Sequence, residues 1–142
     1  MPPASNTAVE FYFTSTEYQP TVMLAYYLSS LDKQYYYEVQ IHSGARKIKW
    51  RKSAYEYVEQ TVGTELSRIC FRLGYVRLGL DITRARYRYV MVNSKIYYPP
   101  DPTVIPDTVA GYNTVDVKVG FEGYFQYLMF TPFYIAVLIN DV

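Results

Sequence analysis

Apolar and polar residues alternate along much of this chain, a pattern that predicts β-strands. The clearest case is residues 34–42. One face of this predicted strand would carry Tyr35, Tyr37, Val39 and Ile41. Residues 46–52 alternate again after the turn Ser43-Gly44-Ala45, so the two segments together predict a β-hairpin.

The same pattern predicts more strands on either side of this hairpin. They cover residues 9–14, 75–82, 83–98 with a turn near Asn93-Ser94, and 115–121. Prolines between residues 99 and 106 predict an extended loop. Residues 124–130 and 133–139 are nearly continuous apolar runs separated by Thr131-Pro132, which is typical of core strands covered on both faces.

Two segments favour helices. Ser53 followed by Glu56 resembles a capping box, and an apolar stripe at helical spacing follows it. The stripe contains Val58, Val62, Leu66, Ile69, Cys70 and Leu73. With Gly74 as a left-handed stop, this predicts a helix over residues 54–73.

The second predicted helix is short and covers residues 20–31. Pro20 suits a first helical position, and Val22, Tyr26, Tyr27 and Leu31 recur at helical spacing. A buried strand is the alternative for this segment. The whole order predicts an α+β fold: a mostly antiparallel sheet with one long and one short helix, in a βαββαβ-like core plus C-terminal strands. The alternative is a β-sandwich or jelly roll with an inserted helix, and in both cases residues 1–142 would form one domain.

The charge balance narrows the choice of partners. Fourteen Lys and Arg against 13 Asp and Glu give a net charge of +1, so the molecule as a whole has no attraction for nucleic acid or an anionic membrane. The N-terminal residues lack the pattern of a secretory signal, and residues 121–139 contain Glu122, Gln126 and Pro132, which do not suit a membrane span. We therefore expect no membrane partner, and a location in a reducing intracellular compartment or in a virion.

Candidate catalytic residues are few. The chain has one His, His42, and one Cys, Cys70, which we expect to be a buried free thiol. One imidazole and one thiol do not make a metal cage, and no base with a nucleophile and an orienting acid is evident. The sequence predicts a protein that is not an enzyme and needs no cofactor or metal.

Two rows of cations are the candidate anion-binding residues. Strand alternation places Lys47, Lys49 and Arg51 on one face of the first segment, and Arg84, Arg86 and Arg88 on one face of the second. Such rows fit a phosphate backbone, but they also fit a solvated strand face that resists edge pairing. Trp50, Tyr87 and Tyr89 would lie on the opposite faces, so bases would have to stack on other rings such as Tyr36 or Tyr97.

Tyrosine is unusually abundant, with 18 residues in 142. Consecutive strand residues point to opposite sides, so each of two Tyr clusters would expose at least one ring if its strand covers a single core face. The clusters are Tyr35, Tyr36 and Tyr37, and Tyr97 and Tyr98. Exposed Tyr is enriched where a partner docks, which predicts a structural or interaction protein, a homo-oligomer or a subunit of a coat, capsid-like shell or filament. The alternative is a nucleic-acid-binding module that uses the two basic rows.

Overall fold

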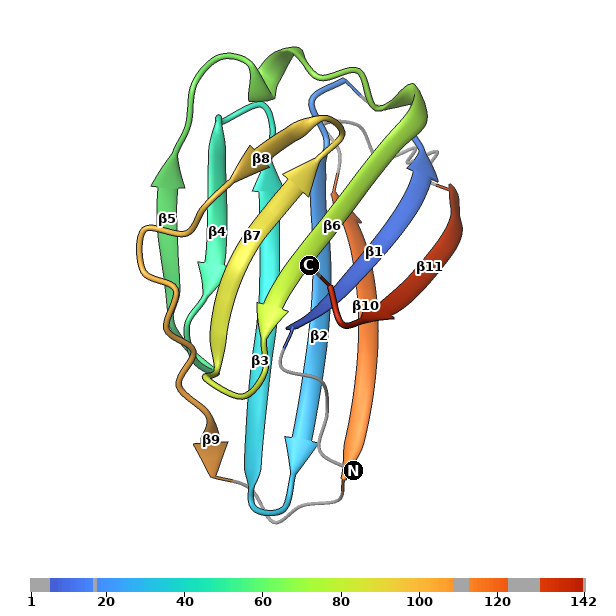
Figure 1. The fold of residues 1–142 in the computed structure, drawn as a ribbon. Coiled ribbons are helices and arrows are strands. Elements are labelled where there is room, and N and C mark those ends of the chain that lie inside the picture. Colours follow the sequence, from blue (N-terminus) through green and yellow to red (C-terminus); the bar gives the residue numbers. More distant parts are fainter. Residues whose placement is uncertain (1–5, 17, 109–112, 123–130, 142) are drawn as a thin grey trace.

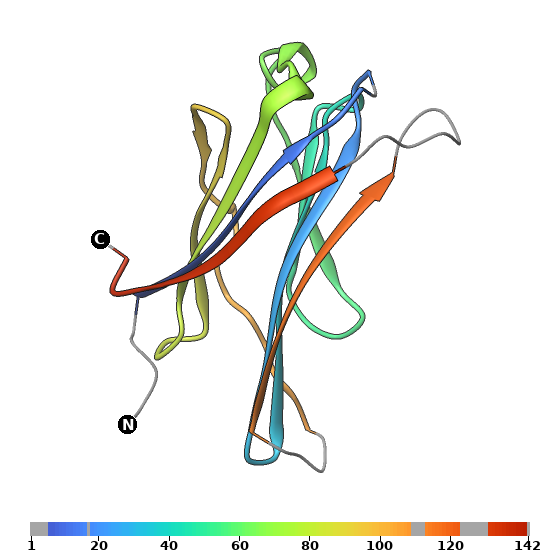
Figure 2. The same cartoon turned by 90° about the vertical axis from the view of Figure 1, so that its right-hand side faces the viewer.

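A computed structural model describes residues 6–16, 18–108, 113–122 and 131–141, which form two antiparallel sheets packed face to face (Figures 1 and 2). Sheet A contains, in spatial order, β11 (Thr131–Ile139), β1 (Asn6–Thr14), β6 (Gly74–Asp81), β7 (Arg86–Val92) and β8 (Lys95–Tyr97). Sheet B contains β10 (Thr114–Glu122), β2 (Thr21–Ser30), β3 (Lys33–His42), β4 (Lys47–Arg51) and β5 (Tyr57–Thr61), with β9 (Asp107–Thr108) beside the start of β3. Two single 3-10 turns, η1 (Leu66–Arg68) and η2 (Phe71–Leu73), connect β5 to β6.

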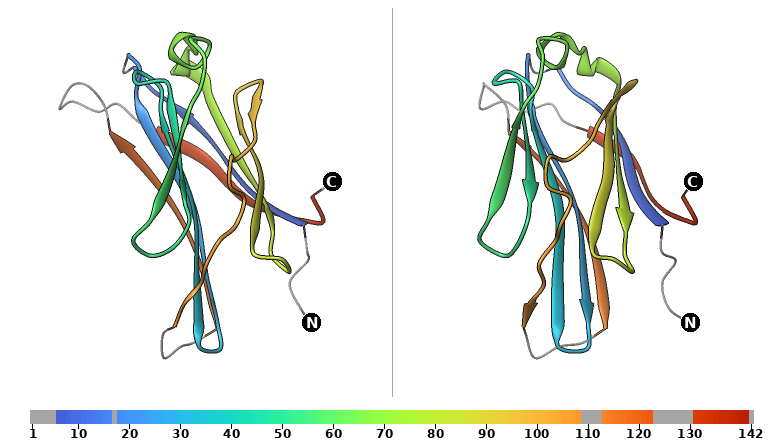
Figure 3. Two further views of the ribbon diagram at one scale, coloured as in Figure 1. Left: turned by 90° about the vertical axis from the view of Figure 1, so that its left-hand side faces the viewer. Right: turned by 60° about the vertical axis from the view of Figure 1, so that its left-hand side comes forward.

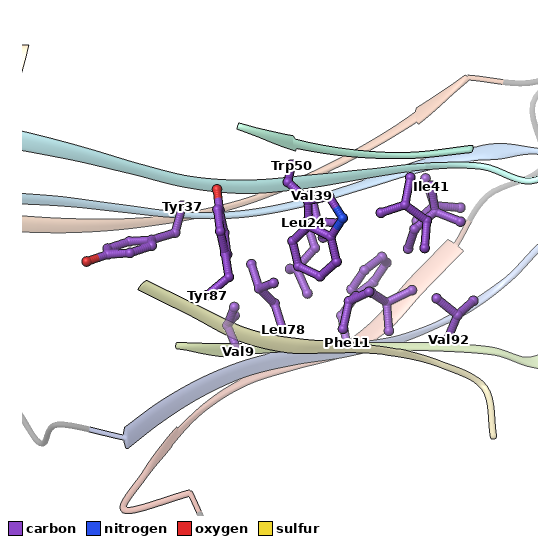
Figure 4. Close-up of a cluster of buried hydrophobic side chains, with 14 of the residues drawn as sticks. Val9, Phe11, Leu24, Tyr37, Val39, Ile41, Trp50, Leu78, Tyr87 and Val92 are labelled. Atoms are coloured by element: carbon purple, nitrogen blue, oxygen red, sulfur yellow. The ribbon is translucent and has the colours of Figure 1, made fainter. Parts of the chain in front are cut away.

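The hydrophobic core fills the space between the sheets (Figure 4). Its largest fully buried side chains are Trp50, Tyr37, Phe11, Phe13, Leu24, Ile41 and Ile48. The Tyr87 ring reaches across from sheet A and packs against Trp50, with ring centroids 5.3 Å apart. Its hydroxyl accepts a hydrogen bond from the backbone N–H of Glu38 at 2.9 Å and donates one to the carbonyl of Arg51 at 2.5 Å. Tyr87 therefore ties the two layers together with both apolar and polar contacts.

The α+β prediction is wrong. The structure is 62% strand and 5% helical, with no helix of seven or more residues in the described part of the chain. The two facing sheets correspond to the sandwich of the alternative, but the inserted helix of that alternative is missing from the described residues as well.

The predicted helix over 54–73 does not form, because Ser53 and Glu56, which resemble a helix start, lie in the turn between β4 and β5. Ser53 Oγ does contact Glu56 Oε1, at 3.4 Å, but the N–H of Lys52 binds the Glu56 carbonyl, and the chain turns back as β5. Val58 then pairs with Trp50 of β4. Tyr, Val and Thr are strand formers, and pairing with β4 outweighs the helical spacing. Gly74 is not a left-handed stop either: its φ is −102°, and it begins β6.

The predicted helix over 20–31 is strand β2, so the alternative for this segment was the correct interpretation. Val22, Leu24 and Tyr26 point into the core at every second position, and each lies opposite a core residue of β3. The pair Val22 and Tyr26 fits both a helical and a strand period, which is why spacing alone misled.

The remaining strand predictions are largely confirmed. Residues 34–42 and 46–52 form the β3–β4 hairpin with the predicted inward faces, and Asn93, with φ of 51°, makes the turn between β7 and β8. β10 forms as expected, and Val117, Val119 and Phe121 pack against the core, although Val115 is 50% exposed. The segment 124–130 lies outside the described residues. The segment 133–139 belongs to β11, but β11 is an edge strand with exposed side chains and is not a covered core strand.

Candidate interaction surface

The first basic row lies on the outer face of sheet B, as alternation predicts. Lys47 and Lys49 both approach Glu59 of β5, at 3.3 and 3.9 Å. Arg51 binds Glu38 of β3 at 3.0 Å. Each cation of this row therefore has an acidic neighbour on an adjacent strand.

Arg51 and Glu38 form the centre of a cluster of tyrosines. The Arg51 guanidinium carbon lies 4.4 Å from the ring centroid of Tyr36, 5.6 Å from that of Tyr27 and 5.5 Å from that of Tyr57. Tyr27, Tyr57 and Gln40 all donate hydrogen bonds to the Glu38 carboxylate. Burial alone would raise the pKa of Glu38, but these hydrogen bonds and the Arg51 charge hold it below its ordinary value. Tyr36 thus does lie beside a cation, yet the guanidinium it covers is already paired.

The second basic row is not a straight row. Arg84 lies in the turn between β6 and β7, 3.6 Å from Asp81, and only Arg86 and Arg88 belong to β7. The register between β6 and β7 shifts after Gly79, because Gly79 pairs with Tyr89 and Leu80 with Tyr87. Arg88 is the extra residue of this bulge. Tyr89 consequently points to the outer face, together with Arg88, and the predicted separation of cations from Tyr89 is wrong.

Arg88 and Tyr89 share one buried carboxylate, which the sequence did not single out. The Asp141 side chain is 2% exposed and accepts hydrogen bonds from Arg88 Nη1 at 2.9 Å, Tyr89 Oη at 2.6 Å and Arg77. Asn140, with φ of 60°, turns the chain back over sheet A and brings Asp141 there. A hollow of about 520 Å³ adjoins the cluster, with Met91, Ile96 and Tyr98 on its rim. Within the described residues, Arg86 is the one cation of the two rows without an acidic partner within 4 Å.

The five tyrosines predicted to form an interface are mostly covered. Tyr37 is fully buried, and Tyr35 and Tyr97 pack against the core. Tyr36 is half-buried over Arg51, and only Tyr98 is exposed. Among the described residues, the exposed tyrosines are Tyr18, Tyr55, Tyr57, Tyr98 and Tyr134.

Four of the 13 exposed large hydrophobic residues of the described part of the chain lie on β11. Ile135 and Val137 lie opposite Phe11 and Val9 of β1, two fully buried core residues, so they point to the inner face of sheet A. They are nevertheless 48% and 42% exposed, and Ile139 is 70% exposed. These side chains are exposed because β10 and β11, the neighbouring edge strands of the two sheets, diverge, so that sheet B does not cover β11 (Figures 2 and 3).

The outer face of β11 is also aromatic. Tyr134 packs on Tyr12 of β1, and Tyr12 packs on Tyr75 of β6, with ring centroids 5.6 and 4.6 Å apart. This tyrosine ladder begins at the free edge of sheet A, where Tyr134 is 48% exposed. Apolar side chains are thus exposed on both faces of one strand.

β11 differs from the other three sheet edges in its charge. β8 has three residues and includes Lys95, β5 has five and includes Glu59, and β10 carries Asp116 and Lys118. β11 has nine residues and no charge. Short or charged edges resist pairing with other chains, and an uncharged long edge does not. The sequence did contain one signal for an edge strand, Pro132, because proline within sheets is found at edges and bulges.

His42 and Cys70 are the single histidine and the single cysteine of the chain. His42 ends β3 on the outer face of sheet B, where its ring nitrogens lie 3.4 Å from Thr21 Oγ1 and 3.1 Å from Gln40 Oε1. Cys70 is exposed in the turn between η1 and η2, so its predicted burial is wrong. In the part of the chain that the structure describes, no three His, Cys, Asp or Glu side chains gather as metal ligands would.

Comparison with protein-family models, curated proteins and solved structures finds no match for this chain. Among the described residues, no helix is long and apolar enough to cross a membrane. What the protein does must therefore be inferred from its own residues and their arrangement.

Proposed function

We propose that the protein is a non-enzymatic structural protein that assembles into a homo-oligomer, as a subunit of a coat, a capsid-like shell or a filament. The observation that carries this proposal is β11: a nine-residue edge strand without charge, with apolar side chains exposed on both faces. Apolar surface of this kind marks interaction sites on folded proteins. An unpaired strand edge adds main-chain donors and acceptors that a partner strand satisfies.

The energies involved favour association that depends on concentration. Burying the exposed halves of Tyr134, Ile135, Val137 and Ile139 contributes about 1 kcal/mol per side chain, or about 8 kcal/mol if both partners contribute equally. Association costs on the order of 4–15 kcal/mol in lost freedom of motion. Because the two quantities are similar, we expect a reversible pair unless other surfaces also join.

Other exposed tyrosines supply such surfaces. Tyr18, Tyr55 and Tyr98 are each more than 60% exposed, and none belongs to β11. A shell or filament needs more than one interface per subunit, since a single two-fold contact closes at a dimer. These rings are the candidates for the second contact.

The nucleic-acid alternative has weaker support. Five of the six candidate cations have acidic partners, so a phosphate would have to displace a carboxylate at nearly every position. The cations of these rows that do contact aromatic rings are Arg51 and Arg88, and both are already paired with carboxylates.

The test is the mass in solution as a function of concentration, measured by sedimentation and light scattering. We expect the unaltered protein to associate reversibly, and Ile135→Lys to weaken that association by about tenfold or more, because a charge would be buried in the contact. Ile96→Lys is the matched control: Ile96 is also 48% exposed and lies on β8, the opposite edge of the same sheet. A strictly monomeric protein at high concentration would contradict the proposal.

A further inference from the structure

We propose that β11 pairs with β11 of a second copy, antiparallel, about a two-fold axis perpendicular to sheet A. This inference rests on the proposed function and specifies its partner. The product would be a continuous ten-stranded sheet built from two copies of the five-stranded sheet A.

The charge pattern of the edges selects β11 itself as the partner. Pairing β11 with β8, β5 or β10 would place Lys95, Glu59, or Asp116 and Lys118, beside the exposed apolar side chains of β11. Desolvating a charge without a partner is costly. β11 against β11 opposes only uncharged residues, so self-pairing is the one edge combination of the described strands without this penalty.

The geometry fixes which residues meet. In an antiparallel pair, residues directly opposite each other lie on the same face of the sheet, so in a two-fold pair the opposed residue numbers add to an even sum. One residue therefore faces its own copy. The register between β1 and β11 shifts between Tyr12 and Phe13, and Pro132 has no N–H to donate, so the regular part of β11 begins at Tyr134.

The regular part ends at Ile139, so Ala136 and Val137 lie at its middle. We expect the smaller of the two, Ala136, to be the self-facing residue, because the two copies of that side chain meet at the axis. Tyr134 would then lie opposite Leu138 of the second copy on the outer face, and Ile135 opposite Val137 on the inner face. The pairing would place Leu138 of the second copy beside Tyr134, at the end of the tyrosine ladder, and Val137 of the second copy beside Ile135, two of the inner-face residues that sheet B leaves exposed.

Cysteine crosslinking tests this arrangement. In a Cys70→Ser background, single cysteines are placed at each position from 134 to 138, and at Ile96 as the control on β8. Facing residues of an antiparallel pair have Cα atoms about 4.5–5.5 Å apart, within the range of a disulfide. We expect Ala136→Cys to give a covalent dimer under mild oxidation, dithiothreitol to remove it, and added Ile135→Lys to abolish it.

The outcomes separate the two proposals. Thermal unfolding first confirms that each variant is folded. If the unaltered protein associates but no position from 134 to 138 crosslinks more than Ile96→Cys, the β11 pairing is wrong and the assembly proposal stands. If the unaltered protein does not associate at any concentration, both are wrong.

Discussion

At the scale of single residues, Glu38 shows how this protein keeps charges inside an aromatic surface. Its side chain is 5% exposed, yet it binds Arg51 and accepts hydrogen bonds from two tyrosines and a glutamine. Removing one partner of such a pair leaves the other charge without compensation, which is far more costly than losing an exposed ion pair.

We predict that Glu38→Gln lowers the free energy of unfolding by about 2–4 kcal/mol at pH 7. Because the folded state lowers the pKa of Glu38, its contribution is present above the pKa of the unfolded carboxyl and disappears as the pH falls through the folded value. The variant should therefore lose less stability on acidification than the unaltered protein. Urea unfolding at several pH values measures both effects.

Glu59→Gln is the control for this prediction. Glu59 also pairs with cations of the same row, but its side chain is 48% exposed. Its loss should change stability by less than about 1 kcal/mol. Equal effects of the two substitutions would show that the buried Glu38 cluster stabilises the protein no more than an exposed ion pair does.

At the scale of elements, the bulge in β7 shows what a single glycine permits. The Tyr89 ring lies over Gly79, where a Cβ atom would come within 2.3 Å of Cε1. Tyr89 has little freedom to move, since its hydroxyl is bound to both Asp141 and Arg77. Gly79 is thus required by the close approach of a fixed ring.

We predict that Gly79→Ala lowers the free energy of unfolding by about 1–3 kcal/mol, because the ring has to move and its hydrogen bonds weaken. Gly120→Ala on β10 is the control: there the close atom is Cε of Met23, at 2.9 Å, the flexible end of its side chain. That change should stay within about 0.5 kcal/mol. Denaturant titration of both variants tests the difference, and a neutral Gly79→Ala would show that the ring is not fixed.

The strands could largely be predicted from the sequence, whereas the structure of the two segments predicted to be helices, the exposed edge and the Asp141 cluster could not. Most strands follow from alternation, because residues such as Tyr37, Val39 and Ile41 repeat at a period of two on a half-covered sheet. The helices failed where a local signal, Ser53 with Glu56, served a turn, and where Val22 and Tyr26 fit two periods. The exposed edge was missed because a continuous apolar run is the same for a central strand and for an uncovered one. The Asp141 cluster joins residues 52 or more positions apart, beyond any local pattern.

At the scale of the whole molecule, two buried tyrosines play opposite parts between the layers. Tyr87 binds backbone groups of sheet B, whereas the Tyr37 hydroxyl is buried without a hydrogen-bond partner among the described residues. An unsatisfied buried hydroxyl costs about 1–3 kcal/mol, and a satisfied one contributes about 1 kcal/mol.

We predict that Tyr37→Phe leaves the free energy of unfolding unchanged or raises it by up to about 2 kcal/mol, and that Tyr87→Phe lowers it by about 1–3 kcal/mol. The two substitutions remove the same atom from two core rings whose centroids lie 5.9 Å apart, so each controls for the other. Thermal and urea unfolding give the comparison. A loss of stability in Tyr37→Phe as large as that in Tyr87→Phe would contradict this account.

The position of Trp50 has a practical consequence. It is the only tryptophan of the chain, it is 1% exposed, and it lies between the layers, away from the free edge of sheet A. Its fluorescence therefore reports whether the two layers are in contact and does not respond to a partner bound at β11. Unfolding and self-association can thus be followed separately in one sample, the first by emission colour and the second by light scattering.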